Sequence, residues 1–450
     1  MKNTLQAGFA RVDITPPMGI PVAGYFEDRF AEGVLDPLEI QALALSDGNN
    51  KAVILSVDII GINAEDVADI KEQISERTGL LKDSVYIAST HTHTGPSFSK
   101  SFVGELPPEW GFYRDTVKAK LIDAAYLALS DLQSAKMGYG TAIAPNIAFI
   151  RRFRMKDGKV RTNPGVGNPD IVAPIGEVDE TVSLLRFKRE KDDIALISFG
   201  VHPDTVGGSL ISADYPRFVR ETVENAIPNT RCIFLNGIQG DVNHVNVNAK
   251  GGDKNGLHPT FDGCDRGYEH AMHMGRTIAG AALQVYGKVN FTDVDSIRFA
   301  ESICEVPANK GTPEQLPLAR EYAKLHAEGR DGEIPFKEME LTTVVAESLR
   351  ILRLENGPDS FFLPLAALAI GPVALVGISG EPFTGIGRGI KEGSPFELTV
   401  ATCATDGYEG YFPMQEAYDE GGYEARSSSF KAGVAERLID EGVKLLNKVK

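Results

Sequence analysis

The sequence contains little cysteine: four residues among 450, namely Cys232, Cys264, Cys304 and Cys403, with no two of them close together. A disulfide-stabilised scaffold needs a dense set of cysteines, and a cysteine zinc site needs CxxC pairs. Both classes are therefore excluded. We expect the four thiols to be reduced and mostly buried.

Long apolar runs are also missing. The first residues, MKNTLQAGFARVDITPP, lack the apolar stretch of about 7 to 15 residues that a secretory signal needs. No later segment reaches the roughly 18 apolar residues of a membrane span, and no basic amphipathic anchor is evident. We therefore expect a soluble, cytoplasmic protein without stable membrane association.

Basic residues are in the minority. Lysine and arginine number 46 against 62 acidic residues, which gives a formal net charge of −16. Such a chain repels phosphate backbones, so nucleic acid is not an expected partner. The expected partner is a small-molecule substrate, and the sequence leaves the oligomeric state open.

Several familiar catalytic motifs are absent. The sequence has no HExxH and no GxxxxGK[ST]. The segment GISGE at 377–381 lacks the second glycine of a nucleophile elbow. The segment GIGRG at 385–389 lacks the third glycine of a dinucleotide fingerprint. A serine triad and a nucleotide cofactor are therefore not supported.

Short apolar runs alternate with amphipathic segments, and this alternation predicts an α/β fold with strands covered on both faces. A helix should start near Asn63, a suitable N-cap, and stop at Gly79. No composition break marks a linker, so we expect one large domain over 1–450. The predicted strands are 51–61, 83–89, 182–188, 193–202, 231–237, 373–380 and 397–404; further helices are 112–132, 215–226, 268–286, 313–328 and 429–448; and long polar loops are 151–180 and 243–266.

Three of the eight histidines follow predicted buried strands. His91 and His93 follow VYIAS, and His202 follows ALISFGV. Ligands in open α/β sheets bind outside the carboxyl ends of strands, so these imidazoles should converge there. Extended backbone would place His91 and His93 on one face. The alternative is that the histidines are simply hydrogen-bonded and packed in a turn.

Carboxylates also follow apolar strands: Asp58 after VILSV, Asp241 after CIFLNGIQG and Glu381 after VALVGISG. A buried carboxylate is costly unless it meets a cation or hydrogen-bond donors. Together with the histidines, these residues are typical of a catalytic zinc site with three protein ligands and one open position. Each acid alone could instead cap a helix, and Asp214 in particular suits an N-cap of the helix that starts near residue 215.

Five segments resemble the catalytic domain of the neutral, or alkaline non-lysosomal, ceramidase family. They are STHTHTGPSF, FGVHPDTVGGSLISADYPRFV, NGIQGDVNH, SGEPFTGIGRGI and DGYEGYFPMQEAYDEGGYEA, in the family's order. The resemblance covers most of the chain. It implies a fold of mixed β-sheets flanked by helices, in a single large domain.

The resemblance also implies a Zn²⁺-dependent hydrolase that cleaves an amide bond. It implies metal ligands at four positions, His91, His202, Glu381 and Tyr411. It places His93 next to the metal, where it could hydrogen-bond to water or to the developing oxyanion.

Further site residues follow from the same resemblance and from the chemistry of zinc sites. A site arginine maps to Arg151 or Arg152. Asp58, Asp214 and Asp241 are candidates to hold the second nitrogen of a ligand imidazole or to accept a proton.

The chain departs from the family pattern at two points. Asn243 stands where the family has the serine of GDVS, and His244 beside it could contact the substrate in its place. The chain also ends without room for the C-terminal β-sandwich domain of those enzymes. We therefore expect cleavage of an amide or ester in a small polar or N-acylated substrate. Two alternatives remain: a zinc lyase or glycosidic-bond-cleaving enzyme acting on a polyhydroxylated compound, and a non-catalytic binding protein with the same fold.

Overall fold

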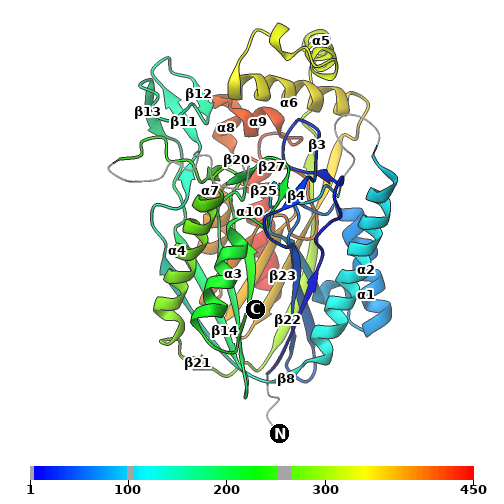
Figure 1. The fold of residues 1–450 in the computed structure, drawn as a ribbon, viewed down its shortest axis with the longest axis vertical. Helices are drawn as coiled ribbons and strands as arrows, with labels where there is room; N and C mark the ends of the chain where they lie inside the picture. Colours follow the sequence, from blue (N-terminus) through cyan, green and yellow to red (C-terminus); the bar gives the residue numbers. More distant parts are fainter. Residues whose placement is uncertain (1–4, 99–105, 251–264) are drawn as a thin grey trace.

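The computed structural model describes residues 5–98, 106–250 and 265–450 (Figure 1). Cys264 and residues 251–264 of the predicted polar loop lie outside this part. Cys232, Cys304 and Cys403 are buried and unbonded to one another, as expected. Within the described residues, no helix is both long and apolar enough to cross a bilayer.

The first of three large sheets is built from the amino-terminal part of the chain. Its strand order is β7-β6-β5-β1-β8, and β6 and β7 run parallel while the others are antiparallel. The strands are β1 (Gln6–Asp13), β5 (Glu39–Ser46), β6 (Lys51–Val57), β7 (Val85–Ser89) and β8 (Gln133–Ser134). Helices α1 (Ala64–Thr78) and α2 (Pro108–Ser130) lie side by side along this sheet (Figure 1).

Helix α1 has the predicted boundaries. The Asn63 side chain accepts a hydrogen bond from the Asp66 backbone N–H at 2.8 Å, and Gly79 ends the helix in the left-handed conformation, with φ 75°. This confirms the predicted N-cap and C-cap.

The second sheet has the order β18-β15-β14-β9-β21, with only β15 and β18 parallel. Its strands are β9 (Lys136–Ile143), β14 (Thr181–Lys188), β15 (Asp193–Phe199), β18 (Thr230–Asn236) and β21 (Phe291–Thr292). Helices α3 (Tyr215–Ala226) and α4 (Tyr268–Tyr286) pack against each other and against this sheet.

The third sheet has the order β22-β23-β24-β26, with only β24 and β26 parallel. Its strands are β22 (Ile297–Pro307), β23 (Ser360–Ile370), β24 (Val373–Ile378) and β26 (Leu398–Thr402). Helices α7 (Thr384–Glu392) and α10 (Val434–Lys448) cover it. The fold is therefore α/β with mixed sheets flanked by helices, which confirms the predicted class.

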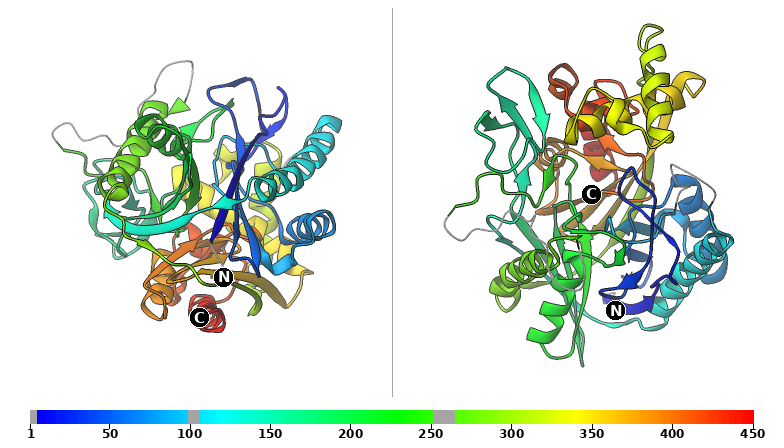
Figure 2. Two further views of the ribbon diagram at one scale, coloured as in Figure 1. Left: turned by 90° about the horizontal axis from the view of Figure 1, so that it is seen from below. Right: turned by 45° about the horizontal axis from the view of Figure 1, so that its top comes forward.

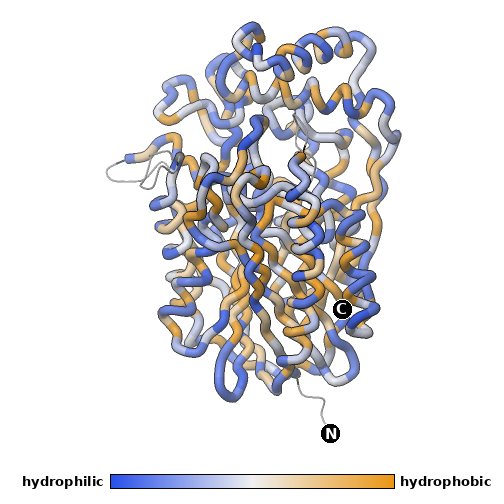
Figure 3. The backbone as a smooth tube through the Cα atoms, turned by 45° about the vertical axis from the view of Figure 1, so that its right-hand side comes forward, coloured by the Kyte–Doolittle hydropathy of each residue, from blue (hydrophilic) through white to orange (hydrophobic). Residues whose placement is uncertain are grey.

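The three sheets share a central core. Leu43 and Ile54 of the first sheet, Leu196 of the second, and Leu368 and Leu375 of the third belong to one buried cluster. Figure 2 shows the sheets converging from three sides, and Figure 3 shows hydrophobic segments, in orange, gathered in the middle of the molecule. This arrangement places the carboxyl ends of β7 and β15 close to the residues that follow β24.

Shorter elements surround these strand ends. The pairs are β2 (Pro21–Val22) with β3 (Arg29–Phe30), β4 (Gly33–Val34) with β17 (Leu210–Ile211), β10 (Phe149–Ile150) with β19 (Val242–Asn243), β16 (Val206–Gly207) with β20 (Asp265–Arg266), and β25 (Glu381–Pro382) with β27 (Tyr411–Phe412). The remaining helices are α5 (Leu316–Ala327), α6 (Glu338–Glu355), α8 (Gln415–Glu420) and α9 (Tyr423–Ser427).

The prediction of a loop over residues 151–180 is wrong, because much of this segment forms a three-stranded sheet. Strands β11 (Arg152–Met155), β12 (Val160–Thr162) and β13 (Ile171–Pro174) pair in the order β12-β11-β13. Phe153 and Met155 are buried in a small cluster separate from the main core, so only a few apolar residues mark this sheet in the sequence. The last helix also starts at Val434, five residues after the predicted 429.

Candidate metal centre

His91 follows strand β7 in an unusual backbone conformation. Its φ is 72°, in the left-handed region that few non-glycine residues adopt. The Nδ1 of the imidazole donates a hydrogen bond to the Ile60 carbonyl oxygen at 2.7 Å. This bond fixes the tautomer, so Nε2 carries the lone pair and faces the interior.

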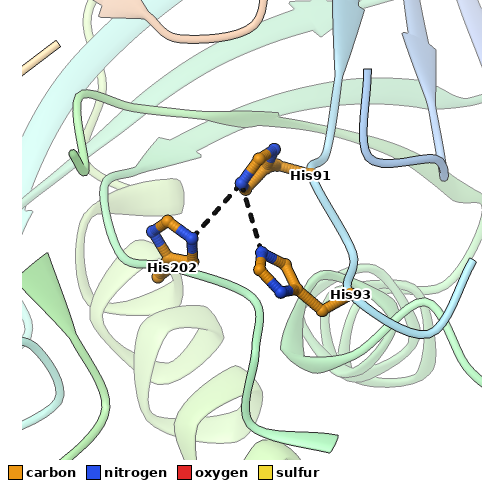
Figure 4. A group of neighbouring side chains, drawn as sticks. All are labelled: His91, His93 and His202. Carbon is orange, nitrogen blue, oxygen red and sulfur yellow. Dashed lines mark hydrogen bonds between the residues drawn. The ribbon is translucent and has the colours of Figure 1, made fainter. Parts of the chain in front are cut away.

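Three imidazoles meet at this point (Figure 4). The Nε2 atom of His91 lies 3.3 Å from Nε2 of His202 and 3.3 Å from Nε2 of His93. One ring nitrogen from each histidine lies within 4.8 Å of those of the other two, and all three residues are buried. The predicted convergence of histidines from two strand ends is therefore present.

Glu381 completes a triangle with two of these histidines. Its Oε2 atom lies 3.4 Å from Nε2 of His91 and 3.5 Å from Nε2 of His202. This oxygen is buried without a hydrogen-bond donor in the described structure. Two ligands that are each 2.0–2.1 Å from a tetrahedral metal ion lie about 3.3–3.4 Å apart. The three edges of 3.3, 3.4 and 3.5 Å fit one shared metal ion.

The protonation states also suit metal binding. Burial, together with the charges of Arg151 and His91, lowers the pKa of His202 to about 3, so its imidazole is neutral. Burial and the neighbouring histidines also lower the pKa of His93 well below its ordinary value. Burial alone would raise the pKa of Glu381, but His91, His202 and Arg151 outweigh it and lower the pKa, so the carboxylate is charged.

Two tyrosines lie beside Glu381. Tyr408 donates a hydrogen bond to Glu381 Oε1 at 2.9 Å, on the opposite carboxylate oxygen from the histidines. Tyr411 is paired with Glu381 across the parallel strands β25 and β27. Its ring stacks on His202 with centroids 6.5 Å apart. The structure therefore places the predicted Tyr411 at the site, and it adds Tyr408.

Arg151, rather than Arg152, faces this group. The Arg151 guanidinium lies 5.3 Å from the Tyr411 ring centroid, and its Nε is 2.7 Å from Glu424 Oε1. The Arg152 guanidinium instead donates to the Gly421 carbonyl at 3.0 Å. Arg151 thus brings a positive charge, held by a fully buried carboxylate, next to Tyr411.

Asp58 and Asp241 are buried but do not contact the imidazoles. Asp58 accepts two hydrogen bonds from Arg220, at 3.0 and 2.7 Å, and one from the hydroxyl of Thr90 at 3.2 Å. Asp241 accepts from the backbone N–H of Thr384 at 2.7 Å and from its hydroxyl at 3.0 Å, at the start of α7. Each carboxylate thus has an evident structural role beside the site.

The remaining predicted polar residues are also engaged in local contacts. Asn243 donates from its amide to Asn163 Oδ1 at 2.9 Å. Asp214 caps α3, accepting from the Tyr215 backbone N–H at 2.6 Å. His244 Nδ1 lies 2.9 Å from the carboxylate of Asp204.

A cavity of about 160 Å³ opens beside the metal-binding group. Its walls include His93, Glu381, Tyr408, Tyr411 and Tyr423, together with the segment 21–30. Tyr408, Glu424 and this amino-terminal segment are site residues that the sequence alone did not indicate. Tyr408 and Glu424 lie in the block DGYEGYFPMQEAYDEGGYEA, where the high density of tyrosine and glutamate is a signal of a polar site. The segment 21–30 has no such signal in its sequence.

No family model matches the sequence. Two solved structures share the fold over nearly the whole chain. The neutral ceramidase from Pseudomonas aeruginosa superposes with a TM-score of 0.73 at 16% identity, covering 100% of this chain and 75% of that one. A structure described as a ceramidase complexed with C2 gives a TM-score of 0.70 at 16% identity, covering 98% of this chain and 75% of that one. The chain therefore has the fold of the neutral ceramidases, which confirms the predicted resemblance at the level of the fold.

Proposed function

We propose that this protein is a Zn²⁺-dependent hydrolase that cleaves an amide or ester bond in a small polar or N-acylated substrate. The observation that carries the proposal is the triangle of His91 Nε2, His202 Nε2 and Glu381 Oε2, with edges of 3.3 to 3.5 Å. Its position beside a cavity, in the fold of known amide hydrolases, supports a reaction at this point.

His91, His202 and Glu381 would hold the metal ion, and Tyr411 would take the fourth position or remain close to it. Two neutral imidazoles and one carboxylate are a common ligand set of catalytic zinc. When bound, zinc acts as a Lewis acid towards a carbonyl group and lowers the pKa of water to about 7.

The protein's own groups would orient the reacting atoms. His93 is neutral and lies next to His91, where its imidazole can exchange a hydrogen bond with the attacking water or with the oxygen of the scissile carbonyl. Arg151 would stabilise negative charge on Tyr411 or on that oxygen. Asn243 and Asp241 would keep the adjoining β19 and α7 in place, since their side chains are engaged there.

The first experiment measures metal content and hydrolysis together. Purified protein should hold about one zinc per chain, in keeping with one triangle of donors. Activity on a panel of amides and esters should vanish after chelation and return with zinc. Hydrolysis in ¹⁸O-labelled water should place one labelled oxygen in the acid product, whereas elimination would give an unsaturated product.

A matched pair of variants assigns the activity to this site. His91→Ala should lose metal and activity together, because His91 lies at the centre of the donor group. His326→Ala is the control, since His326 lies on α5 and contacts Asp331 instead. Full activity of chelated protein, or of His91→Ala, would contradict the proposed function.

A further inference from the structure

The cavity beside the metal-binding group is small for a ligand site. It has a volume of about 160 Å³, whereas sites for drug-sized ligands usually measure about 300–1,000 Å³. At the roughly 30 Å³ that each molecule occupies in liquid water, this space holds about five to six non-hydrogen atoms. The volume therefore limits what can be enclosed next to the metal-binding group.

Aromatic rings form a large part of the cavity wall. Tyr423 makes edge contacts with Phe26 and Tyr411, at centroid distances of 6.2 and 5.5 Å. Tyr25 lies 5.8 Å from the ring of His93, and Ile60 adds an aliphatic surface. Such walls favour an apolar group over a charged one.

One wall is the amino-terminal hairpin, residues 21–30, which contains β2 and β3. It is joined to the histidine-bearing segment at both ends of β2: Ala23 N–H donates to the Gly95 carbonyl at 3.0 Å, and Ser97 N–H donates to the Pro21 carbonyl at 3.0 Å. A Cβ on Gly24, whose φ is 112°, would lie only 2.7 Å from the His93 ring. The hairpin therefore lies closer to His93 than a residue with a Cβ at position 24 would allow.

Arg29 fixes the same hairpin from within. Its guanidinium donates to the His93 carbonyl at 2.9 Å and to the Gly208 carbonyl at 2.5 Å, and it stacks over the Tyr25 ring at 4.1 Å. These contacts connect the hairpin to two other segments of the site. The wall is therefore held in place and sets the size of the cavity.

We propose that this cavity is an acyl pocket that accepts short acyl groups, up to about six carbon atoms, and that the hairpin 21–30 excludes longer ones. The inference rests on the proposed hydrolase function and specifies its substrate class. The apolar acyl group is the part that gains from burial among the rings. The polar amine or alcohol part then faces the opening, where the exposed Glu27 and Asp28 lie.

The test measures kcat/KM for a series of p-nitroanilides and p-nitrophenyl esters that differ only in the acyl group, from acetyl to palmitoyl. We expect the highest values between two and six carbons, and a fall of at least about tenfold at octanoyl, since one methylene in an apolar pocket changes selectivity by about 10- to 200-fold. Calorimetry of the carboxylate products gives a second readout: hexanoate should bind and decanoate should not.

Variants at Phe26 identify the wall. Phe26→Ala should raise the octanoyl-to-acetyl ratio of kcat/KM by at least about tenfold, and Phe26→Trp should lower it. The control is Phe362→Ala, which removes an equally large side chain that is 65% exposed on β23; it should leave the ratio unchanged. Melting temperatures of all variants should confirm that they are folded.

The outcomes separate the inference from the proposed function. Cleavage that is flat or rises with chain length, up to palmitoyl, would overturn the short-acyl pocket and leave the hydrolase intact. An unchanged ratio in both Phe26 variants would show that the hairpin is not the limiting wall. No zinc-dependent cleavage of any member would overturn the hydrolase and the pocket together.

Discussion

Tyr408 offers the sharpest test of how Glu381 is held. Its hydroxyl donates to Glu381 Oε1 at 2.9 Å, which leaves Oε2 directed at His91 and His202. Burial and the neighbouring Glu381 raise the pKa of Tyr408 well above its ordinary value, so it remains a donor throughout the working pH range. Tyr408→Phe removes only this hydroxyl, because the ring is held by close contact with Gly61.

The expected loss follows from the kind of bond removed. A hydrogen bond to a charged group contributes about 1.5–3 kcal/mol, and loss of a partner that orients a metal ligand usually lowers metal affinity by about 10- to 100-fold. Since a tenfold change corresponds to about 1.4 kcal/mol, the two ranges agree. We therefore expect the zinc dissociation constant of Tyr408→Phe to rise by about 10- to 100-fold.

The assay is a competitive titration of zinc against a chelator of known affinity. Tyr139→Phe is the matched control, because Tyr139 also donates to a glutamate, Glu397, at 2.6 Å, but at an exposed position. The control should bind zinc as the unmodified protein does. The zinc dissociation constant of Tyr408→Phe could instead stay within about twofold of that of the unmodified protein, a change well below the one expected for such a partner. That result would refute the view that Tyr408 orients a metal ligand.

Three further predictions address other parts of the site. Asp58→Asn should destabilise the protein by about 3 kcal/mol in denaturant unfolding, because it leaves the buried, charged Arg220 with only the more distant carboxylate of Glu39, 3.8 Å away. Glu424→Gln should lower kcat by about tenfold or more with a smaller change in KM, since Arg151 loses the carboxylate that holds it; equal changes in both would contradict this role. Folding lowers the pKa of His202 from 6.5 to about 3, so the stability that its neutral imidazole contributes is fully present above pH 6.5 and is lost as the pH falls towards 3. Between pH 6.5 and 5.5, the free energy of unfolding of the metal-free protein should therefore fall by about 1 kcal/mol more than that of His202→Gln. Parallel pH profiles of the two proteins would contradict this prediction.

Part of this account could be predicted from the sequence because the relevant signals are local. Apolar runs followed by His91 and His202 marked strands whose carboxyl ends meet, and they do meet. The cap residues Asn63 and Gly79 fixed the ends of α1. Backbone periodicity and helix capping depend on neighbouring residues, so they can be derived without knowledge of the fold.

Other features depend on partners far away in the chain, which local patterns do not reveal. Asp58 looked like a possible partner of an imidazole, but it pairs with Arg220, 162 positions later. Whether Arg151 or Arg152 faces the site depends on Glu424, whose carboxylate lies 2.7 Å from Nε of Arg151. Strand β22 was missed because Arg298, Glu301 and Glu305 break its apolar run, and β23 because Pro364 stands inside its apolar run.

The most direct test of the central claim is an anomalous-scattering crystal structure of the zinc-loaded protein at the zinc absorption edge. One zinc peak should lie about 2.0–2.2 Å from each of three atoms, namely His91 Nε2, His202 Nε2 and Glu381 Oε2. A fully loaded crystal with no peak among these atoms, or with zinc held elsewhere, would contradict the account.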